Sequence, residues 1–316
     1  MRQLTLSLIT LLIALAGAGQ IVIATLHRSM QETIGEDMAV LVQSHAAALD
    51  QQIERTRQIL QGIADNAPER AFENPDQAQA YLTHYAPLLA LFDLGLYMAN
   101  PDEIILGAQL RDMQQARKRI GGKTSASDLN WRAREQRRTL ISQPYASPSC
   151  DGCPAIAMVT PVFHADGRFL GYVAGALRLD GENMLAAIND VRVGKTGYLY
   201  LITRERTMIM HPDPRRIMKP ATRPGQNQLL DKAITEGFEG HGQTINSLGV
   251  PMILGVHYLK STGWLLAANY PLADAEAPFE VVKTRTYLLL AVIGILMAAA
   301  LGLIFRRKRH TTAGSL

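Results

Sequence analysis

Two long apolar segments, residues 4–26 and 286–305, place the strongest constraint on what this chain can fold into. At 1.5 Å per residue, each is long enough to cross a hydrocarbon core about 30 Å thick as a helix. A charged side chain at the centre of such a helix would cost about 2.5 to 3.5 kcal/mol, and neither segment contains one. We therefore predict two transmembrane helices with one large domain between them.

Basic residues beside the two segments predict their orientation. Arg2 precedes the first segment, and the second is followed by Arg306, Arg307, Lys308 and Arg309. The positive-inside rule then places both ends of the chain in the cytoplasm and the domain between the segments outside it. The four basic residues alone account for the formal net charge of +4, so this charge is no argument for nucleic-acid binding.

The first segment has a second interpretation, as a cleavable signal peptide. Arg2, the apolar stretch and the small residues 16–18 imitate such a leader and its cleavage site. The apolar sequence nevertheless continues without a break to Leu26, which a cleaved leader would not need. We therefore expect an uncleaved anchor.

Residues 30–66 predict one long helix that continues the first membrane segment outward as a stalk. Apolar residues recur at steps of three and four, among them Met38, Leu49, Ile53 and Leu60, with charged residues mainly between them. This stripe predicts packing against the chain's own domain. A further role as a homodimer seam stays open.

The rest of the external domain has short strand-like runs separated by Gly, Pro and Asp turns. Because helices do not alternate regularly with the strands, the pattern indicates an α+β fold with antiparallel sheets. The expected strands are residues 94–98, 156–163, 170–179, 197–202, 207–209, 242–246, 252–258 and 264–269. The expected helices are residues 77–91, 180–191 and 228–236.

Several of these segments resemble the double Cache family of extracytoplasmic sensor domains. Residues 193–202 and 208–213 are similar to its strand, turn, strand signature, and residues 263–266 and 271–279 to its closing strand and exit toward the second membrane helix. Residues 141–145, 157–162 and 167–171 resemble the distal module of this family.

The resemblance implies a stalk helix followed by two PAS-like modules, which sense a small molecule outside the cytoplasm and signal through the membrane helices. The expected organisation is a first transmembrane helix with a short cytoplasmic start (1–27), the stalk (28–66), the distal module (67–185), the membrane-proximal module (186–282), a second transmembrane helix (283–305) and a cytoplasmic basic tail (306–316).

The sequence contains no motif that predicts an enzyme. It has no Gly-x-Ser-x-Gly elbow, no His-Glu-x-x-His pair and no Walker-type phosphate loop. We expect no cofactor and no metal, and the tail predicts no kinase, cyclase or methyl-accepting output domain. A signalling partner in the membrane or cytoplasm would then carry the output.

Cys150 and Cys153 form the strongest local chemical signal. Outside the cytoplasm, two thiols three residues apart can form a disulfide in a small loop. Pro154 stands where haem attachment would need His, and a zinc site would need two more ligands. We expect a structural disulfide, while a redox-responsive switch and a metal-binding or catalytic dithiol remain alternatives.

The resemblance also points to a ligand site in the distal module. Trp131 matches the family's amino-acid-binding motif, but Leu129 and Arg132 stand where that motif has Arg and Tyr, and Ala176 replaces its amine-binding Asp. These departures argue against an ordinary α-amino acid. Guanidinium groups with an aromatic wall suit an organic anion. The candidate ligand-binding residues are Trp131, Arg132, Tyr145, Tyr97 and Arg111. The alternative is that Trp131 belongs to the hydrophobic core and that the arginines around it form one solvated helix face.

His211 invites a metal or pH-sensing role, but a lone His before a Pro-Asp turn is more often a hydrogen-bonded structural residue. For the whole chain we predict a bacterial inner-membrane sensor of a periplasmic small molecule. One alternative is the sensory half of a longer diguanylate cyclase, histidine kinase or chemoreceptor. A periplasmic redox protein that uses Cys150 and Cys153 is an alternative from another class.

Overall fold

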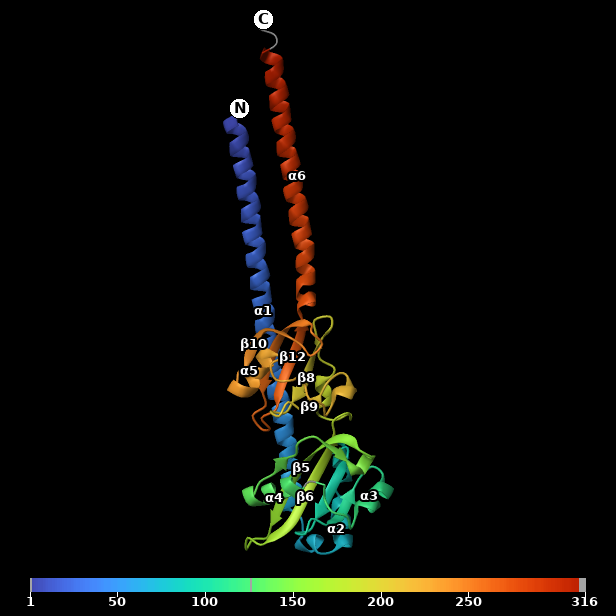
Figure 1. Cartoon of the computed structure of the whole chain (residues 1–316). Helices are drawn as coiled ribbons and strands as arrows, with labels where there is room; N and C mark the ends of the chain where they lie inside the picture. Colours follow the sequence, from blue (N-terminus) through green and yellow to red (C-terminus); the bar gives the residue numbers. More distant parts are fainter. Residues whose placement is uncertain (1, 126, 313–316) are drawn as a thin grey trace.

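The computed structural model describes the backbone of residues 2–125 and 127–312, with the side chains of residues 2–9, 11, 12, 15, 16, 278 and 301–312 left out. Two long helices, α1 (Arg2–Asp65) and α6 (Leu272–Thr312), run side by side away from two stacked α+β modules (Figure 1). The first and last described residues, Arg2 and Thr312, lie at the far end of this helix pair, remote from the modules.

The module farther from the chain ends, here called the distal module, is built on an antiparallel sheet in the order β2-β1-β6-β5-β3, with β4 paired to β5. Its strands are β1 (Gly95–Ala99), β2 (Ile105–Gln109), β3 (Leu140–Ile141), β4 (Tyr145–Ser147), β5 (Cys153–Phe163) and β6 (Phe169–Arg178). Its helices are α2 (Pro75–Thr83), α3 (Met113–Arg119) and α4 (Ser127–Gln136), with short 3-10 turns η1 (Glu69–Phe72), η2 (Ala86–Ala90) and η3 (Pro148–Cys150).

The proximal module, next to the helix pair, repeats this architecture with the sheet order β10-β11-β12-β8-β7 and β9 paired to β8. Its strands are β7 (Arg192–Val193), β8 (Gly197–Ile202), β9 (Met208–Met210), β10 (Gly240–Ile245), β11 (Pro251–Tyr258) and β12 (Leu265–Pro271). Helix α5 (Gln228–Glu236) and the 3-10 turns η4 (Ala186–Ile188) and η5 (Pro214–Arg216) complete it. Helix α6 follows β12 directly.

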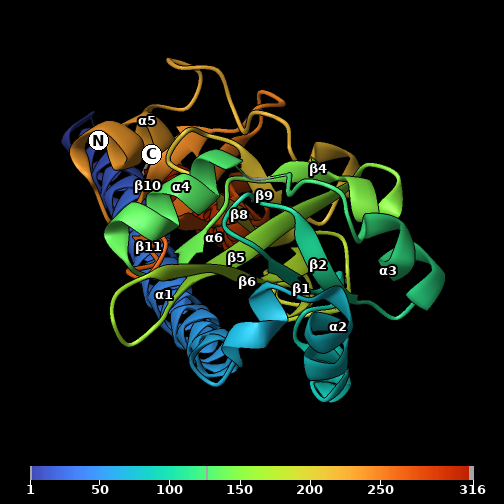
Figure 2. The same cartoon turned by 90° about the horizontal axis from the view of Figure 1, so that it is seen from below.

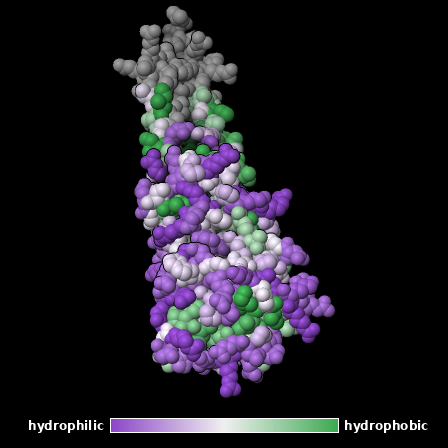
Figure 3. Space-filling view, turned by 60° about the horizontal axis from the view of Figure 1, so that its bottom comes forward, coloured by the Kyte–Doolittle hydropathy of each residue, from purple (hydrophilic) through white to green (hydrophobic). Residues whose placement is uncertain are grey.

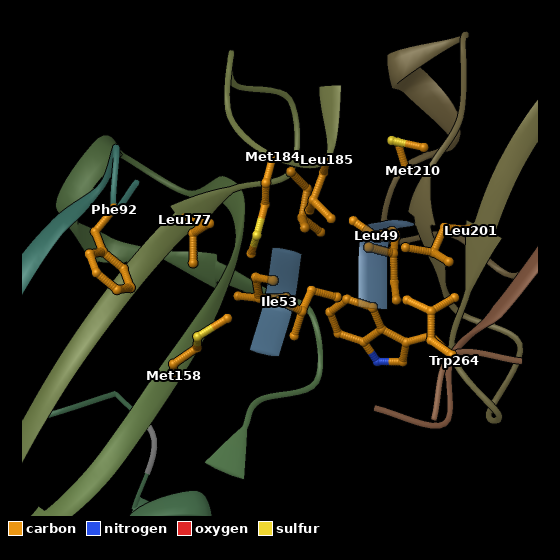
Figure 4. Close-up of a cluster of buried hydrophobic side chains, with 14 of the residues drawn as sticks. Leu49, Ile53, Phe92, Met158, Leu177, Met184, Leu185, Leu201, Met210 and Trp264 are labelled. Carbon is orange, nitrogen blue, oxygen red and sulfur yellow. The ribbon is translucent and has the colours of Figure 1, made fainter. Parts of the chain in front are cut away.

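Helix α1 joins the cores of the two modules. Its apolar stripe is buried on the chain's own sheets, and Leu49 and Ile53 are at most 3% exposed. Figure 4 shows these two side chains between Met158 of the distal module and Trp264 of the proximal module. One continuous cluster of buried side chains therefore extends through both modules along α1. The dimer seam along α1 stays a prediction.

The approach of α1 to the proximal sheet depends on one glycine. A Cβ atom built on Gly255 of β11 would lie 2.9 Å from the Met38 carbonyl oxygen of α1. Ordinary side-chain carbons essentially never come so close to a backbone oxygen. Only glycine lets the helix backbone rest directly on the strand here.

The two faces of the distal sheet pack against different helices, as the view from below shows (Figure 2). Side chains of α1 and α2 share the continuous core with Leu96, Met98 and Met158. On the other face, Leu129 of α4 packs with strands β1, β5 and β6, and α3 packs near β2. Because successive strand residues point to opposite faces, each strand contributes to both layers.

The predicted fold class agrees with the structure in its long helix and its two antiparallel sheets. Strand β8 and helix α5 have the predicted bounds. The helix expected at residues 180–191 is wrong, since only the short turn η4 forms there. Asp93 holds this segment in another shape by accepting hydrogen bonds from the Arg178 amide and the Asn183 side chain. Strands β2, β3, β4 and β7 were not predicted, nor were helices α3 and α4.

One stretch of the described helices, Leu272–Ala300, is long and apolar enough to cross a membrane. Both helices expose large apolar side chains on the part that leaves the modules, including Ile21, Val22, Leu288 and Leu289. Figure 3 shows apolar atoms on both helices beside the grey region. Arg2 and the basic cluster Arg306–Arg309, on which the orientation depends, lie outside the described side chains.

Candidate functional site

A cavity of about 60 Å³ lies in the distal module, on the side of the sheet that faces α3 and α4. Alternation along three strands builds its floor, because Ala99, Ala157, Ala174 and Ala176 face the cavity while their chain neighbours face α1. Small side chains at these positions leave the space open. By the same measure a single water needs roughly 10–15 Å³, so the cavity has room for a small organic molecule.

Two predicted residues, Tyr97 and Tyr145, line this cavity together. The Tyr97 hydroxyl lies 2.8 Å from the Leu94 carbonyl oxygen and 2.9 Å from Ser149 Oγ. Burial raises the pKa of Tyr97, and it raises the pKa of Tyr145 to about 12. Both rings therefore carry neutral hydroxyl groups at ordinary pH. The Tyr97 hydroxyl already donates to the Leu94 carbonyl oxygen, so the Tyr145 hydroxyl is the one that can donate a hydrogen bond to a bound molecule.

Arg119, the last residue of α3, supplies the positive charge of the cavity. Its Nε atom is buried and has no hydrogen-bond partner. The charge lies close enough to Tyr97 and Tyr145 to act against the rise in their pKa values. None of the described residues that line the cavity is Asp or Glu. A buried donor on a guanidinium without a counter-charge is the arrangement that a bound anion would complete.

The rim of the cavity on the α4 side is fixed by Asn130, which is 2% exposed. Its side-chain amide donates a hydrogen bond to Thr124 Oγ1 at 2.7 Å, and both residues line the cavity. This bond ties the first turn of α4 to the loop after α3. It holds the loop that follows Arg119 against the helix.

The opposite rim is the disulfide loop. Cys150 and Cys153 are bonded, with a Cα–Cα distance of 5.5 Å, and they pack against the same small apolar cluster as Tyr97 and Tyr145. The preceding residues Ser147, Pro148 and Ser149 line the cavity. The disulfide thus shares its packing with the two tyrosines of the cavity wall.

Three of the predicted ligand-binding residues lie outside this cavity. Trp131 is 60% exposed, because the buried face of α4 carries Leu129, Asn130 and Ala133 instead. Arg132 is exposed and pairs with Asp128 one turn earlier, at 3.7 Å. Arg111 is exposed just before α3 and does not line the cavity. The aromatic and cationic pair in the cavity is therefore made of tyrosines with Arg119.

Sequence reasoning missed Arg119, Asn130 and Thr124. Arg119 follows Arg117 and Lys118 in a polar stretch that shows no helical pattern strong enough to single it out. Asp112 is the N-cap of α3, and its carboxylate accepts hydrogen bonds from the backbone amides of Gln114 and Gln115. This N-cap signal could have revealed α3 and placed Arg119 at its end.

A long helix that carries two antiparallel α+β modules, with a ligand-sized cavity in the distal one, is the architecture of a two-module sensor domain. The chain belongs to the Cache domain family, which it matches over residues 26–279. It is a Cache sensor domain of the kind found in chemoreceptors and histidine kinases.

Several chemoreceptors resemble this chain in sequence or fold. The methyl-accepting chemotaxis protein PctB of Pseudomonas aeruginosa is 24% identical over 173 residues, which is 54% of this chain and 26% of that protein. This chain thus spans about a quarter of the length of that curated relative.

Two solved structures share the fold. The ligand-binding domain of the P. aeruginosa amino acid chemoreceptor PctC in complex with GABA has a TM-score of 0.54 at 18% identity, covering 74% of this chain and 96% of that one. The sensory domain of the Campylobacter jejuni chemoreceptor Tlp3 has a TM-score of 0.59 at 10% sequence identity, and the match covers 81% of this chain and 99% of that one.

Proposed function

We propose that this protein is a membrane-anchored sensor that binds a small organic anion in its distal module outside the cytoplasm. The observation that carries the proposal is the buried, unpaired Nε of Arg119 in a cavity walled by Tyr97 and Tyr145. An anion would supply the missing acceptor, the Tyr145 phenol would donate to another of its oxygen atoms, and Tyr97 would serve as an aromatic wall. Apolar floor residues would contact the rest of the molecule.

The signal would pass along α1. This helix packs against the distal sheet at one end and the proximal sheet in its middle, and it then runs beside α6. Outside the modules, Gln20 donates a hydrogen bond to the Tyr287 hydroxyl at 2.7 Å, and His27 lies 3.2 Å from Glu276. A ligand shifts such a helix pair only if it binds one arrangement more tightly than the other. The output would lie in a separate partner.

Binding is testable with the full chain in detergent micelles. Lactate, succinate and benzoate would be titrated by calorimetry, with alanine as the zwitterionic comparison. We expect at least one carboxylate to bind and Arg119→Gln to weaken it about ten- to hundredfold, the range for hydrogen bonds to charged groups. Arg117→Gln, an exposed position on the same helix, is the matched control and should bind as the parent does.

The outcome against the proposal is equally specific. Tight binding of alanine that is indifferent to Arg119→Gln would exclude both the ligand class and the site. Binding of a carboxylate that Arg117→Gln weakens as much as Arg119→Gln would indicate a diffuse charge effect and not a site.

A further inference from the structure

The proximal module contains a second cavity that the proposed function does not use. It lies between strands β8, β9 and β12 and the loops around residues 216–227 and 246–247, and its inner part measures about 20 Å³. Its lining is unusually polar for a buried space. Five polar lining residues are at most 9% exposed: His211, Thr222, Asn227, Asn246 and Asn269.

Three buried polar atoms in this lining have no hydrogen-bond partner: His211 Nε2, Thr222 Oγ1 and Asn269 Oδ1. A folded protein leaves only a few such atoms per hundred residues, because each costs about 1 to 3 kcal/mol. Three around one small cavity indicate that something else bonds to them. Asn227 differs from these three residues, because its side-chain oxygen already accepts hydrogen bonds from the Leu230 amide and the Thr244 hydroxyl.

His211 presents a hydrogen-bond donor to the cavity. The backbone amide of Asp213 donates to its Nδ1 at 2.9 Å, so a neutral ring carries its proton on Nε2. Burial first, and then the nearby charge of Arg216, lower the pKa of His211 to about 4. The ring is therefore neutral at ordinary pH, and its Nε2–H donor has no acceptor within the protein.

Thr222 and Asn269 can present donors as well. The Thr222 hydroxyl rotates freely to donate, and no bond within the protein holds it. The Asn269 side chain lies 3.0 Å from the Tyr198 hydroxyl, which can either accept or donate. If Tyr198 donates to the amide oxygen, the amide nitrogen of Asn269 turns toward the cavity. All three unpaired groups can then donate to one acceptor-rich molecule.

The charge of the cavity is positive. Arg216 lines it, and its Nη2 is held in place by bonds to the Ala221 carbonyl oxygen at 3.1 Å and Ser247 Oγ at 2.8 Å. No Asp or Glu is among the described residues of the inner cavity. In the open groove outside it, Asp213 is already paired with Arg215 at 2.9 Å, and Arg223 adds a further cation.

We propose that the proximal module holds a second ligand site, which takes the carboxylate head of a small monocarboxylic acid of the size of formate or acetate. The head would accept hydrogen bonds from His211 and Thr222 beside Arg216, and the carbon end would point into the outer groove. The inner space suits one or two water-sized groups, which a carboxylate matches and a phosphate exceeds. This site does not depend on the ligand of the distal module.

The test uses the full chain in detergent micelles with sodium acetate as the probe and sodium chloride at equal ionic strength as the reference. Thermal midpoint and saturation-transfer NMR on the acetate methyl group report binding, because a native-state ligand stabilises by RT ln(1 + [L]/Kd). We expect acetate to bind, with phosphate at least tenfold weaker. Arg216→Gln should weaken acetate at least tenfold and Thr222→Val about three- to tenfold.

Thr222→Val is the decisive variant, because the hydroxyl it removes makes no bond within the protein and the valine keeps the shape. All measurements use an Arg119→Gln background, which removes the cation of the distal site, and Lys260→Gln, at an exposed position of the proximal module, is the control that should leave acetate binding unchanged. Acetate without any effect beyond that of chloride would mean that ordered water alone fills the cavity, and the proposal fails. It also fails if Thr222→Val binds acetate as well as the protein with Thr222 does, or if Lys260→Gln weakens the binding as much as Arg216→Gln, since the effect would then come from diffuse charge.

Discussion

The hydroxyl of Tyr97 on β1 lies 2.9 Å from Oγ of Ser149, the residue that precedes Cys150 of the disulfide. This contact connects the wall of the distal cavity to a four-residue covalent loop. The disulfide and the candidate site are thus one structural unit. In the sequence, Tyr97 and the disulfide loop are more than fifty positions apart, and the fold brings them into contact.

Replacing both cysteines by serine should leave the protein folded but loosen this rim. A loop of four residues constrains the unfolded chain little, so the loss of stability should be roughly 2 kcal/mol. Carboxylate binding in the distal module should weaken several-fold, because Ser149 and Pro148 lose their fixed position. Calorimetry and a denaturant titration measure the two effects. Ser149→Ala keeps the disulfide and isolates the hydroxyl contact, and a double serine variant with unchanged affinity would show that the loop does not shape the site.

Ala176 offers a direct test of ligand charge. It lies on the floor of the cavity opposite Ala157 of β5 and is 3% exposed. Ala176→Asp should weaken the binding of a carboxylate tenfold or more, because two like charges would share a space of low polarity. Ala176→Asn has the same size without the charge and should cost less. Equal affinities for the two variants in calorimetry would rule out an anionic ligand at this floor.

The sequence predicts the fold well where its signal is local. Strand β8 is a run of alternating Tyr and Leu that begins at Gly197 and ends before the charged turn 204–206, and helix α5 begins after the Asn227 cap, so both bounds follow from neighbouring residues. The segment 180–191 has apolar residues at helical spacing, yet Asp93 binds it from another part of the chain. No local pattern contains that contact.

The candidate site is less predictable for the same reason. Tyr97 and Tyr145 could be named because the distal module combines aromatic with cationic residues, as a site for an organic anion would. Which face of α4 is buried depends on the sheet beneath it. The polar Asn130 is therefore buried and the aromatic Trp131 exposed, the opposite of what their side chains alone would suggest. Arg119 acquires its importance only from the tyrosines that the fold brings to it.

Two glycines should respond oppositely to substitution by alanine. Gly255→Ala forces a carbon against the Met38 carbonyl oxygen and should destabilise the protein by about 1 to 3 kcal/mol, as overpacking does. Gly62→Ala lies on α1 with nothing within 4 Å of the added carbon. It should stabilise by about 0.5 to 1 kcal/mol through helix propensity. Denaturant midpoints measure both changes, and a neutral Gly255→Ala would show that α1 does not rest on β11 as described.

Membrane topology is open to a simple test. Reporter fusions after residue 150 should be active only outside the cytoplasm, and fusions at the C-terminus only inside it. This outcome follows from two spans with basic flanks at both cytoplasmic ends. Replacing the four basic residues after position 305 by glutamine is the matched control, since it should reduce the preference for an internal C-terminus. A C-terminus outside the cytoplasm would overturn the predicted orientation.

The buried ring of His211 predicts how stability depends on pH. Its pKa of about 4 in the folded protein lies below the ordinary value of 6.5, so between these pH values the unfolded chain binds a proton that the folded chain does not. Stability from this residue is therefore fully present above about pH 6.5 and falls as the pH decreases toward 4. The charge of Arg216 lowers the pKa of His211 further and Asp213 acts against this, while the rings of Tyr198 and Tyr200 lie beside the imidazole.

The measurement is the thermal midpoint of the full chain in detergent between pH 7.5 and 4.5, compared with His211→Asn. Asparagine can still accept the hydrogen bond of the Asp213 amide but does not titrate. The parent should lose stability more steeply than this variant as the pH falls below 6.5. His84→Asn, at an exposed position, is the control and should follow the parent. Parallel curves for the parent and His211→Asn would mean that the imidazole gains a proton in the folded state as readily as in the unfolded one, contrary to its burial beside Arg216.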